Sequence, residues 1–131
     1  LHTAIVTSLG ATTFIVFAMP NARPAQPRRL LGGYLAGAAS GVLCCLVAQV
    51  LPTALPGSSP RLLQITLAGA AVALATLLMV STHTEHPPAA GFALGLVLDS
   101  WTLDTLLFVA GAVLLLSGLR LLFKRTLTDL V

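Results

Sequence analysis

Long apolar runs separated by short polar stretches that contain proline dominate the chain. A helix needs roughly 20 apolar residues to cross about 30 Å of hydrocarbon. Three runs reach that length and two do not: the long ones span Leu30 to Leu51, Leu62 to Ser81 and Thr102 to Phe123, and the short ones span Ala4 to Met19 and Pro88 to Leu98. The pattern predicts an all-α transmembrane bundle of about five segments, two of them short or broken.

The composition supports burial in lipid. Of the 131 residues, 56% are hydrophobic and only 8% are charged, whereas about 25% of the residues in soluble domains are charged. So few charges cannot cover a water-exposed surface. We therefore expect the lipid bilayer to be the main partner of the chain, and a single transmembrane domain over residues 1–131.

The basic residues predict how the segments cross the membrane, because loops that stay in the cytoplasm are enriched in Lys and Arg. Six of the seven fall in the first loop or at the end of the last segment; they are Arg23, Arg28, Arg29, Arg120, Lys124 and Arg125. If all five segments cross, these two regions share one side. The prediction is a multi-pass protein of a prokaryotic inner (plasma) membrane with a cytoplasmic carboxyl end.

The fourth segment can cross only if the chain before it also lies at membrane depth. Pro88 to Leu98 gives roughly 17 Å of helix at 1.5 Å per residue. Residues Thr82 to Pro87 must cover the remainder without helix, and such backbone is tolerated only where protein or a water-filled cavity satisfies its polar groups.

This stretch carries the candidate chemistry of the chain. Proline in a first helical turn is typical of a helix start, and the first amides of a helix are unpaired and attract anions. His86 exchanges protons near neutral pH, and ionisable groups at membrane depth are usually functional. We therefore predict an anion site that comprises Thr84, Glu85, His86, Pro87, Pro88, Ala89, Ala90 and Gly91.

Two alternatives for this stretch stay open. It is either this site or a solvated loop just outside the lipid headgroups. A metal site of His83, Glu85 and His86 is less favoured, because no cysteine or further acid stands nearby to complete a ligand shell. We expect no metal and no cofactor.

The first short segment repeats the pattern of the fourth. It is rich in small and hydroxyl residues, is followed by a turn and a long glycine-rich helix, and adds Ser8, Gly10, Thr12 and Thr13 to the candidate site. In a five-segment topology the two short helices run in opposite directions. Inverted repeats of this kind occur in many transporters. We also expect that a native first helix, absent from this sequence, precedes Leu1 and completes the repeat.

Two further groups have a functional and a structural interpretation. Gly33, Gly37 and Gly41 form a small-residue face that lets another helix approach closely, either inside the bundle or between subunits. Gln26, Arg28 and Arg29 form either a cytoplasmic mouth that collects anions or ordinary topogenic charge.

Other classes of function lack their signatures. The chain has no glycine loop for phosphate, no Ser and His with a partnered acid, and no pair of cysteines two residues apart. The basic residues are too few and too close to the membrane for a nucleic-acid reader. An enzyme is therefore not expected.

The sequence resembles the HPP family of small integral membrane proteins, named for the motif seen here as His86-Pro87-Pro88. The resemblance extends over nearly the whole chain, from Ser8-Leu9-Gly10-Ala11-Thr12 through the proline-rich stretch Pro20 to Gly33 and the stretch Thr84 to Gly91. It implies a helical bundle preceded by one more helix, and an association with nitrite transport.

The main hypothesis is therefore a transporter or channel for a small inorganic anion, with nitrite the best candidate. So small a bundle would need copies of itself to surround a pore, which favours a homo-oligomer. The alternative is a non-transporting membrane module that anchors a partner or senses for it.

Overall fold

The computed structural model describes residues 3–54, 59–99, 101–123 and 125–130, and residues 52–54 by their backbone alone. All regular structure in these ranges is helical, as predicted. The elements are α1 (Thr3–Ala18), the 3₁₀ turn η1 (Arg23–Ala25), α2 (Pro27–Ala54), α3 (Pro60–Ser81), α4 (Pro88–Leu98) and α5 (Leu103–Phe123).

Proline marks where three of these helices begin. Pro27, Pro60 and Pro88 are the first residues of α2, α3 and α4, a position where the missing N–H has no helical partner to lose. The sequence placed the start of this segment at Leu30, and α2 begins three residues earlier, so Arg28 and Arg29 lie in its first turn. In the loop expected between the second and third segments, Pro52 to Pro60, residues 55–58 lie outside the described residues.

The long helices meet the requirements for crossing a membrane. Pro27–Leu51 of α2, all of α3 and all of α5 are long and apolar enough to span it, and α1 and α4 are shorter apolar helices. Their outward faces carry large apolar side chains such as Leu35, Leu77 and Leu107, each more than 60% exposed. Such surfaces suit lipid rather than water, so the protein is a multi-pass membrane protein.

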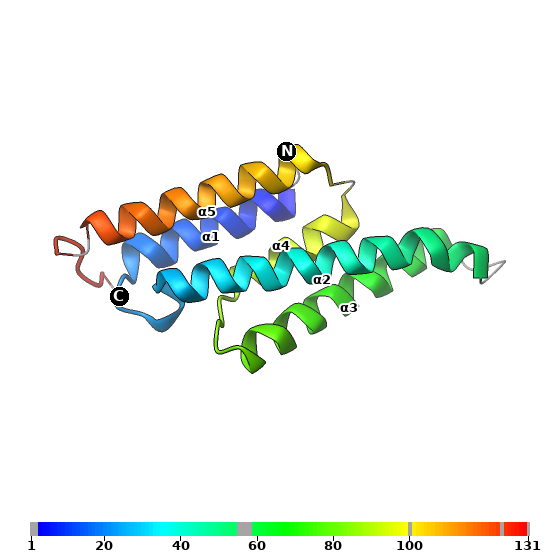
Figure 1. Ribbon diagram of the computed structural model, residues 1–131, viewed down its shortest axis with the longest axis horizontal. Helices are drawn as coiled ribbons and strands as arrows, with labels where there is room; N and C mark the ends of the chain where they lie inside the picture. The colour runs from blue at the N-terminus through cyan, green and yellow to red at the C-terminus, as the bar shows by residue number, and fades with distance from the viewer. Residues whose placement is uncertain (1–2, 55–58, 100, 124, 131) are drawn as a thin grey trace.

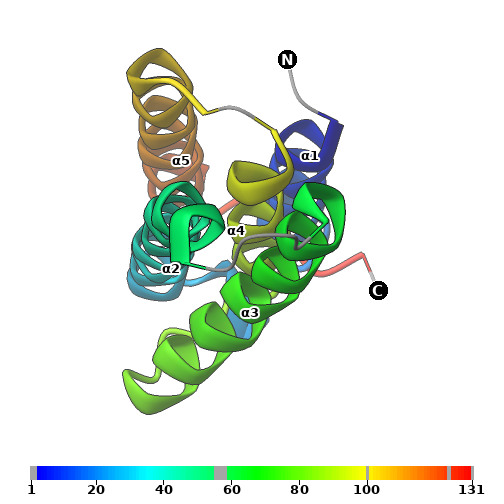
Figure 2. The same ribbon diagram turned by 90° about the vertical axis from the view of Figure 1, so that its right-hand side faces the viewer.

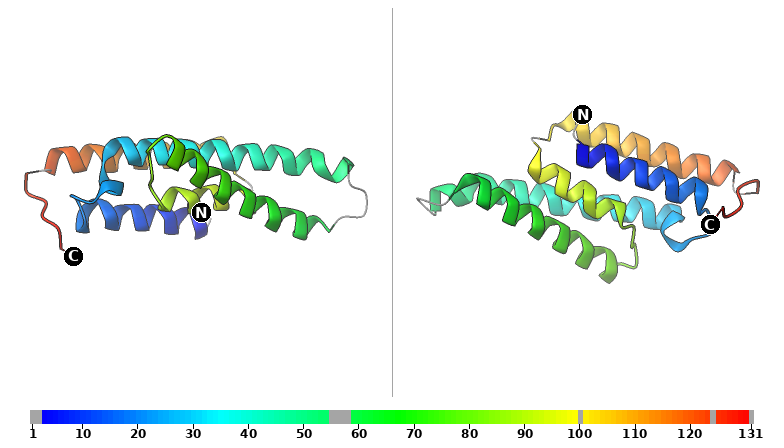
Figure 3. Two further views of the ribbon diagram at one scale, coloured as in Figure 1. Left: turned by 90° about the horizontal axis from the view of Figure 1, so that it is seen from below. Right: turned by 180° about the vertical axis from the view of Figure 1, so that it is seen from behind.

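The short helix α4 lies at the centre of the bundle. Figure 2 shows it surrounded by α1, α2 and α3. Phe92, Ala93 and Leu96 of α4 are all but fully buried. Helix α5 packs on α1 and α2 instead, and α2 with α3 extends as a hairpin past α1 and α5 (Figures 1 and 3).

The first loop and the carboxyl end meet at one end of the bundle, as predicted for five crossing segments. The Arg120 guanidinium donates to the Pro20 carbonyl at 2.7 Å, and the Asn21 amide donates to the Asp129 carboxylate at 2.9 Å. Helices α1 and α4 run in opposite directions (Figure 1), as an inverted repeat requires. Lys124 lies outside the described residues, and the missing first helix stays a prediction.

Candidate functional site

A tight turn ends α3 and starts the non-helical stretch Thr82 to Pro87, which we call the 82–87 link. The His83 amide donates to the Val80 carbonyl at 3.2 Å and the Thr84 amide donates to the Met79 carbonyl at 2.9 Å. This is the Schellman arrangement, and His83 occupies the left-handed position where glycine is usual, with φ of 54°. The turn reverses the chain toward the bundle interior.

The glycine face of α2 receives the link and α4. A Cβ placed on Gly33 would lie 2.7 Å from Cβ of His86, one on Gly37 would lie 2.5 Å from the Ala89 carbonyl oxygen, and one on Gly41 would lie 2.8 Å from Leu96. These three residues therefore serve internal packing, the first of the two interpretations. Gly32 extends the face, since its Cβ would lie 2.5 Å from the Thr84 side chain.

His86 is fully buried where the link, α1, η1 and α2 meet. Its Nδ1 lies 2.9 Å from the Pro24 carbonyl oxygen, and its Nε2 lies 2.8 Å from Oγ1 of Thr12. The ring also lies beside Tyr34, with 5.6 Å between centroids. Thr12 is six residues from the end of α1, so the imidazole lies roughly 9 Å inside that end of the bundle.

A chain of hydroxyl groups continues from His86 along α1. Oγ1 of Thr12 lies 2.9 Å from the Tyr34 hydroxyl, which in turn lies 3.4 Å from Oγ of Ser8. Ser8 and Thr12 share one helical face because they are four residues apart. Gly10 and Thr13 fall off that face and are exposed, so the structure does not bring them to the site.

Two members of this cluster were not predicted. Tyr34 is the only tyrosine of the chain and directly follows Gly33 of the small-residue face. Because buried tyrosine hydroxyls usually find a polar partner, this position could have indicated that Tyr34 belongs to the polar cluster. The Pro24 carbonyl had none, because a backbone acceptor is positioned by the turn η1 and not by its side chain.

The ion pair of Arg29 and Glu85 closes the link onto the first turn of α2. The backbone N–H of Glu85 and the Arg29 guanidinium hold the pKa of the Glu85 carboxyl below its usual range, against the opposing effect of desolvation. Of the predicted cytoplasmic mouth, Arg29 reaches the site through this ion pair, whereas Gln26 and Arg28 are exposed.

Free amides were expected at Ala89, Ala90 and Gly91 at the start of α4, and for Ala89 and Ala90 this prediction was wrong. The Ala89 amide donates to the His86 carbonyl at 2.9 Å, and the Ala90 amide donates to the Pro87 carbonyl at 3.1 Å. Pro87 already has helical backbone angles, φ −51° and ψ −38°, so the carbonyls before α4 turn toward its first amides. An anion here therefore cannot rely on the amides of Ala89 and Ala90.

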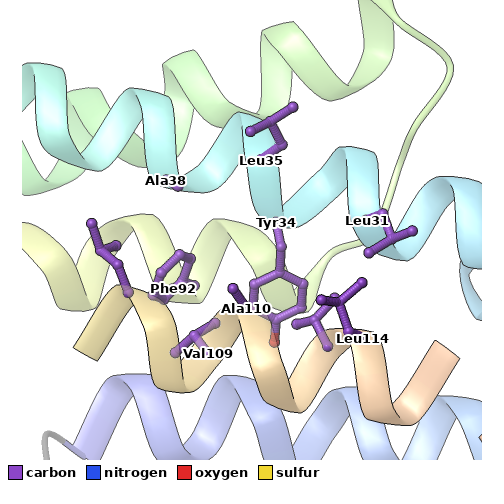
Figure 4. Close-up of a pocket in the computed structure, with 10 residues that line it drawn as sticks. Leu31, Tyr34, Leu35, Ala38, Phe92, Val109, Ala110 and Leu114 are labelled. Carbon is purple, nitrogen blue, oxygen red and sulfur yellow. The ribbon is translucent and has the colours of Figure 1, made fainter. Parts of the chain in front are cut away.

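Three crevices border the cluster. One of about 170 Å³ lies between α3 and α4 and is lined by Thr76, Met79, Val80, Glu85, His86, Pro87 and Ala90. A second, of about 320 Å³, lies between α1 and α4 and includes Ser8, Pro87, Pro88 and Gly91. The third, of about 340 Å³, is apolar and lies between α2 and α5; Figure 4 shows Tyr34 forming its wall with the hydroxyl turned toward α1.

The chemistry available at the cluster is proton exchange and hydrogen bonding. Among the residues that the structure describes, no three His, Cys, Asp or Glu side chains gather as metal ligands would. The cluster offers one imidazole, three hydroxyl groups and an adjacent ion pair.

The fold is that of a multi-pass helical membrane protein in which a non-helical link with the buried His86 leads into a short central helix. A comparison with known families finds the HPP transmembrane region over residues 1–129. The chain belongs to this family. No curated protein and no solved structure matches it.

Proposed function

We propose that the protein moves a small inorganic anion across the membrane, with nitrite the best candidate. The observation that carries the proposal is the full burial of His86 within a polar cluster inside an apolar bundle. Polar and ionisable groups at such a place are costly to the fold, and in membrane proteins they usually mark a substrate or proton path. The family resemblance points to the same function.

Charge balance links the anion to His86. A second proton would give its ring a positive charge, and a buried charge needs a partner. Arg29 and Glu85 already neutralise each other, so they leave no net charge for the imidazolium. An anion in the 170 Å³ crevice beside His86 would supply the missing negative charge.

Nitrite uptake into proteoliposomes tests the function. We expect wild-type protein to take up nitrite and the variant His86→Ala to lose most of that uptake, while circular dichroism and gel filtration show that it remains folded. The matched control is His83→Ala, because His83 is exposed and has no place in the cluster. Full uptake by a folded His86→Ala variant would exclude this mechanism, and no uptake by the wild type would exclude nitrite.

A non-transporting anchor or sensor is the second candidate. The observation in its favour is that both ring nitrogens of His86 already lie within hydrogen-bonding distance of protein atoms. This is expected if His86 only stabilises the turn before α4. Under this hypothesis, wild-type liposomes take up neither nitrite nor nitrate, chloride or formate above the rate of empty liposomes.

A further inference from the structure

Thr12 has more hydrogen-bonding neighbours than its single hydroxyl proton can serve. Its Oγ1 lies 2.9 Å from the Ser8 carbonyl oxygen, 2.8 Å from Nε2 of His86 and 2.9 Å from the Tyr34 hydroxyl. A threonine hydroxyl donates once and accepts up to twice. The Thr12 proton must therefore choose between the carbonyl of Ser8 and the ring of His86.

The opposite side of the ring fixes which nitrogen carries a proton. A carbonyl oxygen only accepts, so the 2.9 Å contact with Pro24 requires a proton on Nδ1 of His86. In the neutral ring Nε2 then has no proton and must accept one hydrogen bond. Thr12 is the neighbour that supplies it.

We propose that His86 and Thr12 form an internal proton-binding site, in which a proton bound at Nε2 reverses the Thr12 hydroxyl from the histidine ring to the Ser8 carbonyl. In the neutral state Thr12 donates to Nε2. In the charged state Nε2–H donates to Oγ1 of Thr12, and Thr12 donates to Ser8. The atoms balance in both states, because only one proton is added and only one hydroxyl rotates.

Every polar atom involved has a partner in both states. The Tyr34 hydroxyl donates to Oγ1 of Thr12 throughout, since that oxygen can accept from Tyr34 and His86 together. Nδ1–H keeps its bond to the Pro24 carbonyl. The charged ring therefore forms without leaving a buried donor unpaired, and these hydrogen bonds offset part of the cost of desolvating its charge.

The surrounding elements add few competing charges. Helices α1 and α4 carry no titratable side chain, and the only one on α3 is Arg61, at its far end. From α2 the titratable neighbour is Tyr34, and the pair of Arg29 and Glu85 closes the link. His83 on the link and Arg23 on η1 are exposed.

This proton site deepens the proposed function. Only its use in transport rests on that function; the binding of the proton does not. A proton held inside the bundle supplies the charge that an anion in the adjacent crevice would neutralise, so the two would bind together. The proton is thus the coupling ion, and its binding can be measured with no anion substrate present.

Nitrogen-15 NMR of the ring nitrogens tests the site directly. The sample is full-length protein in lipid nanodiscs without nitrite, labelled at histidine and carrying His2→Gln and His83→Gln, so that only His86 is observed. At high pH we expect the neutral tautomer with the proton on Nδ1, which is the minor form of histidine in water. As the pH falls, the same ring should gain its second proton while the fold persists.

Variants of Thr12 separate the switch from simple burial. Thr12→Val keeps the shape but removes the hydroxyl, so we expect the midpoint of the His86 titration to fall by about one pH unit or more, since hydrogen bonds to a charged group are the stronger ones. Thr12→Ser keeps the hydroxyl and should restore the wild-type midpoint.

Three results would overturn the proposal: a neutral ring with its proton on Nε2, no second proton down to pH 4 in the folded protein, or equal midpoints in wild type and Thr12→Val. A protein that passes these tests but moves no anion would refute the proposed function alone. A protein that transports nitrite but fails them would refute the proton site alone.

Discussion

The backbone carbonyl of Ala89 points into the space left by the missing side chain of Gly37. A Cβ at that position would lie 2.5 Å from the oxygen, closer than real Cβ atoms approach, and the obstacle is backbone that cannot rotate away. The contact sets the separation of α2 and α4, and through α4 it sets the position of the His-Pro-Pro stretch.

Gly37→Ala should therefore destabilise the protein. We expect a loss of about 1–3 kcal/mol, the usual range for overpacking a close interface, measured as a lower midpoint of thermal unfolding in detergent. The matched control is Gly69→Ala on α3, where a Cβ meets nothing within 4 Å. That change should be neutral or stabilise by up to about 1 kcal/mol, and equal losses in the two variants would contradict the packing argument.

His83→Gly should stabilise the turn after α3. A non-glycine residue in the left-handed region costs about 1–2 kcal/mol, and part of this gain is offset because glycine orders more on folding. We expect a net gain of about 0.5–1 kcal/mol in the same unfolding assay, with nitrite uptake unchanged. A loss of uptake would mean that the exposed histidine has a role that its position does not indicate.

The ion pair of Arg29 and Glu85 predicts a pH dependence of stability. The folded pKa of Glu85 lies below its unfolded value, so its contribution is complete above the ordinary carboxyl pKa of about 4.3 and is lost as the pH falls through the folded pKa. The difference in unfolding midpoint between wild type and Glu85→Gln should stay constant from pH 7 to 5 and shrink below about pH 4.3. A difference that grows on acidification would contradict this sign.

Contact between the first loop and the carboxyl end predicts the topology. The Leu130 amide donates to the Ala18 carbonyl at 2.9 Å, so the two regions must lie on one side of the membrane. In a background with both native cysteines replaced, Asn21→Cys and Thr128→Cys should react with an impermeant thiol reagent from the same side. The basic residues predict that this side is the cytoplasm; labelling of both from outside intact cells would reverse the orientation.

Helix number and boundaries could be predicted because they depend on local properties of the sequence. Runs of apolar residues and the prolines at 60 and 88 identify the helices to within a few residues. The glycines of α2 indicated a close contact, but the sequence could not say with what. That answer depends on Ala89 and His86, which are brought there by the turn after α3.

The candidate site could be predicted only in part. The stretch that contains His86 was identified, and Ser8 and Thr12 were placed with it because both short helices share a pattern. Two features could not be predicted: the hydrogen bonds that the first amides of α4 already make, and the Pro24 carbonyl that accepts from His86. Both are backbone features, and no side-chain pattern encodes them. The site therefore changed from an anion bound by free amides to a histidine held by the Thr12 hydroxyl and the Pro24 carbonyl.

The shortness of α4 also has a consequence for how the protein is made. Its 11 residues are too few to span the hydrocarbon core on their own. The helix is stabilised by packing against α1, α2 and α3. Membrane insertion of α4 must therefore wait until its neighbours are already in the bilayer. The His-Pro-Pro cluster is therefore complete only once α4 has docked between α1, α2 and α3.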